Sequence, residues 1–184
     1  MAKLQLKKVR LSFPDLFTAR PFKPGDEPKF KGTFLIEKDS PQIKVVEAAI
    51  KAAAAEKWGA KADAIVKGIQ ANPNKFCFQD GDTKDYDGYE GMMALSASNK
   101  ARPLLLDRDK KQLVEADGRP YAGCFVNVSL EVFAYTNSGN GIAASLKGVQ
   151  FVKNGDAFGG GAPASPDDFD DLGVDEEETD DLAG

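Results

Sequence analysis

The 184-residue chain contains no histidine, only two cysteines and a single tryptophan. The lack of histidine removes the commonest general base and metal ligand, together with every Ser-His or Cys-His nucleophile pair. Cys77 and Cys124 do not form a CxxC pair, so the sequence indicates neither a disulfide framework nor a cysteine-based zinc site. We expect both thiols to be buried as small hydrophobes. These absences favour binding over catalysis.

Long apolar runs are also missing. No stretch of about 18 apolar residues is present, and residues 1–13 alternate Lys with Leu where a signal peptide would have an apolar block. We therefore expect a soluble, cytoplasmic protein without membrane contact. Neither GxxxxGK[ST] nor GxGxxG occurs after a strand, so nucleotide hydrolysis has no visible basis and no cofactor is expected.

Basic residues are absent from the C-terminal part of the chain. Residues 154–184 hold eleven of the 29 carboxylates and none of the 24 Lys and Arg, so residues 1–153 have a net charge of +6 and the remainder −11. A Gly- and Pro-rich stretch over 154–166 predicts a flexible linker, and the block of like charge predicts a disordered interaction tail. We expect one domain over 1–153, followed by linker and tail over 154–184. The basic domain suits a polyanionic partner.

The apolar pattern alternates over several segments, which predicts strands over 3–13, 29–37, 75–78, 91–97, 124–135 and 142–152. A slip in this alternation between Leu6 and Val9 predicts a β-bulge. A helix with Asp39 or Ser40 as N-cap and Pro41 in its first turn is expected to end near Gly59, before a shorter helix over 61–70. Loops are predicted over 20–28, 80–88 and 107–119. The fold class is therefore α+β and mostly β: an OB-like antiparallel β-barrel with a helical insertion, plus a disordered acidic C-terminal tail.

Several stretches carry a resemblance to a known family: Arg10–Phe13 with Leu16 and Phe17, Pro28–Phe30, Phe34–Lys38, Asp80–Asp82, Arg102, Pro103, Asp107, Tyr121–Val128, Phe133–Tyr135, 140–142 and 146–150. In these stretches the chain resembles the small single-stranded DNA-binding proteins of tailed bacteriophages, which are OB-fold proteins with a mobile acidic C-terminus. The resemblance covers nearly all of residues 10–153. It implies stoichiometric coating of single-stranded DNA during phage replication or recombination, in the cytoplasm of the bacterial host and without catalysis.

Single-strand binding without sequence preference needs a cationic groove for phosphates and flat side chains for unstacked bases. Strand alternation turns Phe133 and Tyr135 to the face opposite Val126 and Val128, where they either stack on bases or pack under the helix. Tyr86 and Tyr89 lie in an Asp- and Gly-rich loop, where they either contact DNA or anchor the loop. Each basic residue can equally be a solvated surface charge. The candidate DNA-binding residues are Lys7, Lys8, Arg10, Lys29, Lys31, Lys75, Tyr86, Tyr89, Lys100, Arg102, Phe133, Tyr135 and Lys147.

The tail is expected to modulate DNA binding and to recruit replication or recombination proteins. Relatives with such tails often end on a bulky apolar tip, whereas this chain ends Leu182-Ala183-Gly184, so Phe169 and Leu172 are the candidate apolar elements. The candidate partner-binding residues are Asp167, Asp168, Phe169, Asp170, Asp171, Leu172, Asp175, Glu176, Glu177 and Glu178. Duplex DNA is expected to bind more weakly, and the sequence leaves open whether the protein is a monomer or a dimer.

An acidic cluster over residues 80–90 is the one feature that suggests metal chemistry. It fails as a calcium loop starting at Asp80, because Lys84 occupies the fifth position, Asp85 replaces Gly at the sixth and Gly91 replaces Glu at the twelfth. We therefore expect no metal site. The rival interpretations are a strand-annealing recombination mediator, a metal-dependent nuclease using this loop and an acidic DNA mimic.

Overall fold

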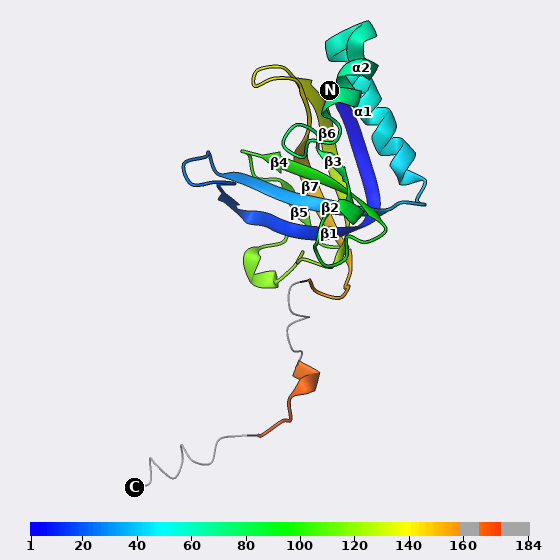
Figure 1. The fold of residues 1–184 in the computed structure, drawn as a ribbon. Helices are drawn as coiled ribbons and strands as arrows, with labels where there is room; N and C mark the ends of the chain where they lie inside the picture. The colour runs from blue at the N-terminus through cyan, green and yellow to red at the C-terminus, as the bar shows by residue number, and fades with distance from the viewer. Residues whose placement is uncertain (159–165, 174–184) are drawn as a thin grey trace.

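The computed structural model describes residues 1–158 and 166–173. The strands in this part of the chain are β1 (Ala2–Arg20), β2 (Lys29–Glu37), β3 (Phe78–Asp80), β4 (Met92–Asn99), β5 (Leu104–Leu106), β6 (Phe125–Tyr135) and β7 (Gly141–Lys153) (Figure 1). Its helices are α1 (Gln42–Trp58) and α2 (Ala62–Ile69), with short 3-10 turns η1 (Gly59–Lys61), η2 (Gly81–Thr83), η3 (Glu115–Asp117) and η4 (Pro166–Asp168). None of the helices described is long and apolar enough to cross a membrane.

Five strands close into a barrel in the order β1-β2-β4-β7-β6, which confirms the predicted OB-like barrel with a helical insertion. Neighbouring strands pair antiparallel except at the closing seam, where β4 and β7 are parallel and Ser98 lies opposite Ser145. A ring with an odd number of strands cannot alternate direction throughout, so at least one parallel pair is unavoidable. The predicted antiparallel pairing thus holds around the ring except at this seam, and β5 adds a second parallel pairing, with β7.

Strand β1 is longer than the predicted 3–13, and its pairing shifts register three times, once against β6 and twice against β2. The shift in pairing with β6 between Leu6 and Val9 confirms the predicted bulge, and Lys8 has a φ of 52° there. A second shift, between Ser12 and Asp15 in the pairing with β2, leaves room for Pro14, which has no N–H to donate. Bulges bend a strand, so β1 leaves β6 after Arg10 and follows β2 as far as Arg20.

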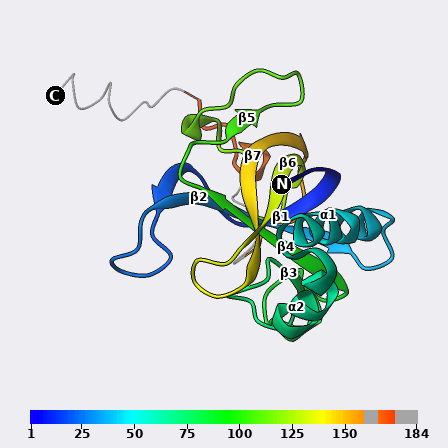
Figure 2. The ribbon, with the colours of Figure 1, turned by 90° about the horizontal axis from the view of Figure 1, so that it is seen from above.

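The barrel interior is filled by alternating residues of β6 and by one face of α1. Val126, Val128, Leu130 and Val132 are at most 3% exposed, as the predicted alternation requires, and they share a core with Val46 of α1. Viewed from above, α1 lies beside β1 and β6 (Figure 2), the two strands it chiefly contacts. The helical insertion therefore packs mainly against β1 and β6, and not across β4.

The helix boundaries differ slightly from the predicted ones. Helix α1 ends at Trp58, as expected, because Gly59 adopts a φ of 57°. At its start Pro41 occupies the N-cap position instead of Asp39 or Ser40, although the Ser40 Oγ still accepts a hydrogen bond from the Gln42 N–H at 3.2 Å. The predicted strand over 75–78 begins only at Phe78, because the Asn72 side chain and carbonyl fold residues 72–76 into a turn.

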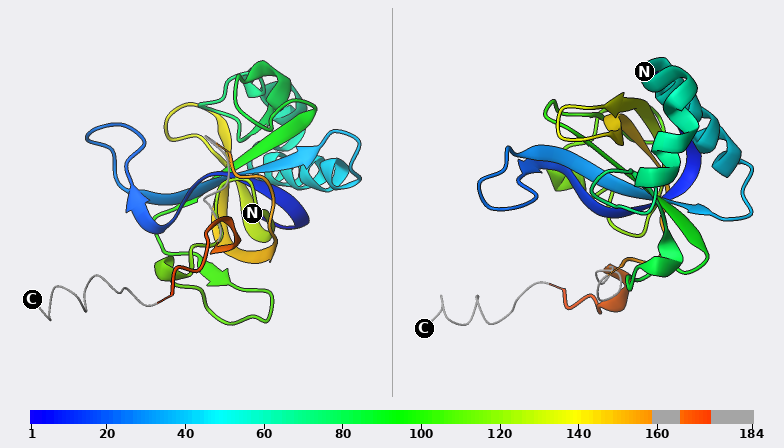
Figure 3. Two further views of the ribbon diagram at one scale, coloured as in Figure 1. Left: turned by 90° about the horizontal axis from the view of Figure 1, so that it is seen from below. Right: turned by 45° about the horizontal axis from the view of Figure 1, so that its top comes forward.

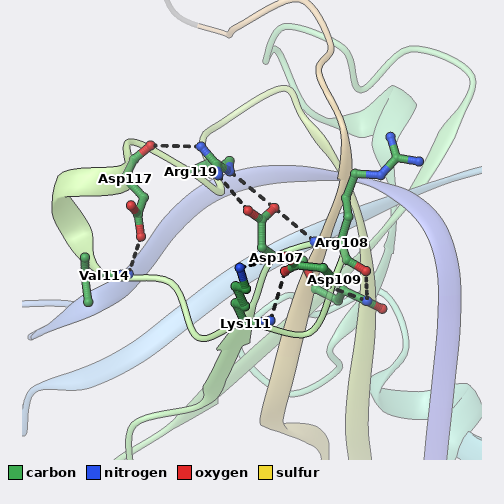
Figure 4. Close-up of polar contacts among 8 residues, drawn as sticks. Asp107, Arg108, Asp109, Lys111, Val114, Asp117 and Arg119 are labelled. Atoms are coloured by element: carbon green, nitrogen blue, oxygen red, sulfur yellow. Dashed lines mark hydrogen bonds and ion pairs between the residues drawn. The ribbon is translucent and has the colours of Figure 1, made fainter.

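A long excursion between β5 and β6 lies on the opposite side of the barrel from α2 (Figure 3). The three-residue strand β5 was not predicted, since three consecutive leucines show no alternation. Side chains of the loop 107–119 hold it closed: Asp107 accepts from Arg119 at 2.6 Å, and Asp117 accepts from the Val114 N–H at 2.7 Å (Figure 4). We call this segment the 107–119 loop.

Both cysteines are buried, as predicted. Burial raises the pKa of Cys77 to about 12 and the pKa of Cys124 to about 11. Neither thiol therefore ionises appreciably near neutral pH, which fits a packing role.

Candidate nucleic-acid interface

A groove of about 1170 Å³ crosses the outer faces of β2 and β4. The loop between β1 and β2 (blue) and the loop between β6 and β7 (yellow) project from this side of the barrel (Figure 2). Residues from the second half of β1, from the turn before β3 and from the start of β7 complete the lining. Strands far apart in the sequence thus contribute to one continuous surface.

Two aromatic rings form the exposed rim of this groove. Phe13 of β1 is 55% exposed and Tyr86 of the loop after η2 is 53% exposed, and their ring centroids lie 4.9 Å apart in an edge-to-face arrangement. Tyr89 lies behind them, with its ring centroid 5.2 Å from that of Tyr86. Phe22, in the loop between β1 and β2, adds a third ring that is 74% exposed. These rings offer flat apolar surfaces to a ligand in the groove.

Tyr89 is placed differently from Tyr86 although both were predicted to contact DNA. It is 3% exposed, and its hydroxyl donates to the Oγ of Ser12 at 3.0 Å. Burial raises the pKa of the Tyr89 hydroxyl, while its hydrogen bond to Ser12 opposes that rise. The burial of Tyr89 fits the anchoring role that the sequence left as its alternative, whereas Tyr86 is half exposed in the groove. DNA contact by either residue stays a prediction.

Phe13 was not among the predicted site residues. Its φ of 46° is in the left-handed region, which costs a residue with a side chain of the order of 1–3 kcal/mol. Ser12 pairs with Thr33 on one side of it, and Asp15 pairs with Lys31 on the other. Ser12 is buried against Tyr89, and at this conformation the Phe13 ring is also turned to the groove side of the strand. Sequence alternation could not show this, because the irregularity shifts the phase of the strand at that residue.

Six basic residues line the groove: Arg20, Lys29, Lys31, Lys75, Lys84 and Lys100. Lys29, Lys31, Lys75 and Lys100 were predicted, while Arg20 and Lys84 were missed. Three carboxylates lie among them: Asp15 pairs with Arg20 at 3.2 Å and with Lys31 at 3.5 Å, Glu27 pairs with Lys100 at 2.8 Å, and Asp26 accepts from the Lys23 N–H at 3.1 Å. The Lys75 Nζ donates to the Ser138 carbonyl oxygen. The groove is therefore basic, with part of its charge held by internal carboxylates.

Other predicted residues lie outside the groove lining. Arg10 donates to the carbonyl oxygens of Gly123 and Asp156, Arg102 lies 5.2 Å from the Phe30 ring centroid, and Lys147 pairs with Glu131 at 3.7 Å. Lys7 and Lys8 are exposed on the first bulge of β1. On β6, Tyr135 lines the groove, whereas Phe133 lies on the outer strand face with its ring centroid 6.4 Å from that of Tyr135. Their contribution to DNA binding stays a prediction.

The first two carboxylates of the acidic loop after β3 have a structural role, because they hold the loop to neighbouring residues. Lys38 pairs with Asp80 at 2.6 Å and also with Asp82, and these hydrogen bonds hold the pKa of both carboxyl groups below their usual range. Asp82 also accepts from the Gly91 N–H at 2.8 Å. Within residues 1–158 and 166–173, no three His, Cys, Asp or Glu side chains gather in a way that suits a metal ion.

The predicted tail residues are only partly described. Phe169 and Leu172 are 71% and 91% exposed, and η4 precedes them. Asp167, Asp170 and Asp171 are exposed on the same segment, to which Asp168 also belongs. Asp175, Glu176, Glu177 and Glu178 lie outside the described residues, as does the stretch 159–165 of the predicted linker.

A closed OB-type barrel whose groove combines exposed rings with basic residues has the features of a single-strand nucleic-acid-binding protein. Over residues 2–183 the chain matches the model of the family described as Enterobacter phage Enc34, ssDNA-binding protein, and it belongs to that family. This match confirms the resemblance found in the sequence.

The chain is also similar to individual proteins. The chain is 49% identical over 178 residues to putative protein p50 of Acyrthosiphon pisum secondary endosymbiont phage 1, covering 96% of this chain and 97% of that one. The structure is similar to that of the single-stranded DNA-binding protein from bacteriophage Enc34 in complex with ssDNA, with a TM-score of 0.73 and 26% identity over 86% of this chain and 90% of that one. The single-stranded DNA-binding protein gp2.5 of bacteriophage T7 shares the fold, with a TM-score of 0.54 and 18% identity over 94% of this chain and 98% of that one.

Proposed function

We propose that this protein coats single-stranded DNA without sequence preference during phage DNA replication and recombination, in the cytoplasm of the host cell. The observation that carries the proposal is the juxtaposition of the exposed rings of Phe13 and Tyr86 with the basic groove. Membership of a family of single-stranded DNA-binding proteins supports it.

The chemistry of binding follows from the two kinds of side chain. Lysines in the groove neutralise phosphates and release counterions, so affinity falls as salt rises. Tyr86 and Phe13 stack on bases, which is tolerant of sequence because every base presents a π-face. Duplex DNA keeps its bases stacked on one another, so it gains only the phosphate contacts and binds more weakly.

No catalytic step is part of this proposal. Among the acidic residues that a nuclease would need, Asp80 and Asp82 are held by Lys38. Their engagement favours a loop-closing role. Incubating labelled single-stranded DNA with the protein and Mg²⁺ or Mn²⁺ distinguishes binding alone from nuclease activity. Cleavage that persists after further purification contradicts a pure binding function.

The acidic tail acts, in this proposal, as a competitor for the groove and as a site for replication or recombination proteins. Its net charge of −11 is tethered to a body of +6, so its local concentration near the groove is high. Phe169 and Leu172 are exposed among acidic residues, which suits a partner with an apolar pocket rimmed by basic residues.

The direct test is a salt titration of binding to a labelled oligo(dT), with duplex DNA of the same length as competitor. We expect log affinity to fall with log salt by about 0.7 for each phosphate neutralised. A parallel series uses the full chain with the carboxylates of 175–181 changed to amides, which should bind duplex more tightly at low salt. Salt-independent affinity, or duplex bound better than oligo(dT) by the parent chain, contradicts the proposal.

A further inference from the structure

The segment that follows β7 does not leave the barrel at the predicted domain end, residue 153. The Tyr121 hydroxyl donates to the Asn154 Oδ1 at 3.0 Å and also contacts Gly155, and the Phe158 N–H donates to the Ala122 carbonyl oxygen at 3.1 Å. Residues 154–158 therefore pack against residues 121 and 122, in the segment that precedes β6. We call these five residues the strap.

Close backbone approach fixes the strap at two glycines. A Cβ on Gly123 would collide with the Asp156 carbonyl oxygen, and a Cβ on Gly155 would collide with the Gly123 carbonyl oxygen. Gly123 also has a φ of 106°, which a residue with a side chain rarely adopts. Glycine at positions 123 and 155 thus allows the strap to contact the segment before β6.

Arg10 of β1 also contacts the strap. Its Nε donates to the Gly123 carbonyl oxygen at 3.0 Å, and its Nη2 donates to the Asp156 carbonyl oxygen at 2.6 Å. The same guanidinium lies 4.2 Å from the centroid of the Phe158 ring. Arg10 therefore links the strap to the segment before β6 through its hydrogen bonds and contacts the Phe158 ring, and it lies outside the groove lining.

Phe158 joins the strap to the loop that carries Tyr86. Its ring packs with Leu35, Tyr89 and Ala94, and it occupies the space into which a side chain on Gly88 would project. Tyr86 and Tyr89 flank Gly88, and Phe13 is three residues after Arg10 on β1. The loop is thus held to β1 by three contacts: Phe158 with Arg10, the Tyr89 hydroxyl with the Ser12 Oγ, and the Tyr86 ring with the Phe13 ring.

We propose that Arg10 and Phe158 are positioning residues for DNA binding: together they hold the loop of Tyr86 against β1, so that Tyr86 and Phe13 present a preformed stacking surface. This inference rests on the proposed function. Without Phe158 the loop loses its support below Gly88, and the ordering of Tyr86 must then be provided by the DNA, at a cost in affinity.

The experiment measures oligo(dT) affinity of full-length Phe158→Ala, of Tyr86→Ala and of the double variant. We expect Phe158→Ala to weaken binding about 3- to 10-fold, the range set by ordering one or two side chains on binding. In the Tyr86→Ala background the same substitution should have little further effect, because its benefit acts through Tyr86. Ile69→Ala, which trims a partly buried side chain of α2, is the control for a general loss of packing.

Hydrogen exchange of residues 84–90 supplies a readout that does not depend on DNA. We expect faster exchange there in Phe158→Ala, and a smaller increase in Arg10→Lys, which keeps the charge but loses the paired donors to two carbonyl oxygens. Unchanged exchange in both variants, or an equal loss of affinity with and without Tyr86, overturns the inference. Failure of the parent chain to bind oligo(dT) contradicts the proposed function and leaves the exchange result to decide the role of the strap.

Discussion

The groove and the 107–119 loop both carry several basic side chains but use them differently. The groove over β2 and β4 places its lysines beside the exposed rings of Phe13, Tyr86 and Phe22. The 107–119 loop also carries several cations, but its exposed large apolar side chain is Val114, which has no ring. Its acidic residues bind its own basic residues and backbone, as with Asp107 and Arg119 (Figure 4). We therefore expect a DNA-binding surface where basic side chains lie beside exposed rings, and not where they are paired with carboxylates of their own loop.

The largest expected effect on oligo(dT) affinity comes from the exposed rings, which the groove has and the 107–119 loop lacks. Tyr86→Ala should weaken oligo(dT) binding by about 1–3 kcal/mol, because one stacked base loses its platform. Phe13→Ala should act in the same direction, and Val114→Ala in the 107–119 loop is the matched control. Fluorescence anisotropy at fixed salt measures the three affinities. Equal losses in Tyr86→Ala and Val114→Ala would remove the distinction between the regions.

A somewhat smaller effect concerns phosphate contacts. Lys75→Gln or Lys29→Gln should reduce the slope of log affinity against log salt by about 0.7, the value for one phosphate contact on a single strand. Lys110→Gln removes the same charge from the 107–119 loop and should leave the slope unchanged. If Lys110→Gln alters the slope as much as Lys75→Gln does, DNA reaches both regions.

Sequence patterns predicted most of the barrel because its strands alternate strictly. The inward residues of β6 and the bulge between Leu6 and Val9 both followed from the period of two in apolar residues. The parallel seam between β4 and β7 did not follow, because it depends on closure of the ring and not on any local pattern.

The groove was predictable only in part. Lys29 and Lys31 were found because they alternate with buried residues on a regular strand. Phe13 and Arg20 were missed because irregularities in β1 change which side chains face outward, and Phe22 because it lies in a Pro-rich loop without periodicity. Charge alone did not reveal that the Arg10 guanidinium faces two carbonyl oxygens and the Phe158 ring, and its contact with DNA stays a prediction.

The carboxylate inside the groove offers a test of smaller size. Asp15 neutralises part of the charge of Arg20 and Lys31, so Asp15→Asn should tighten oligo(dT) binding at low salt by about two- to fivefold, the range for partly exposed ion pairs. Asp109→Asn makes the same charge change beside Lys111 in the 107–119 loop and should have little effect. A loss of affinity in Asp15→Asn would show that this carboxylate instead orients the two cations for phosphate.

The smallest expected effect on DNA binding comes from the ion pair that closes the 107–119 loop. Hydrogen bonding to Arg119 holds the pKa of Asp107 below its ordinary value of 3.8. Because the folded-state pKa is lowered, the stabilising contribution of the pair is fully present above that ordinary value and is lost as the pH falls through the folded-state pKa. Arg119→Gln should therefore move the pKa of Asp107 back toward 3.8, which a carboxyl titration followed by NMR measures directly.

Oligo(dT) affinity at neutral pH should be unchanged in Arg119→Gln, since Arg119 and Asp107 line no part of the groove. Amide exchange within residues 107–119 should rise, because Asp107 loses its donor and the loop its closing contact. An Arg119→Gln variant with a normal Asp107 titration but weakened DNA binding would reverse both expectations. It would make the 107–119 loop a second DNA-binding surface, in which Arg119 contacts phosphate and the pairing with Asp107 belongs only to the free protein.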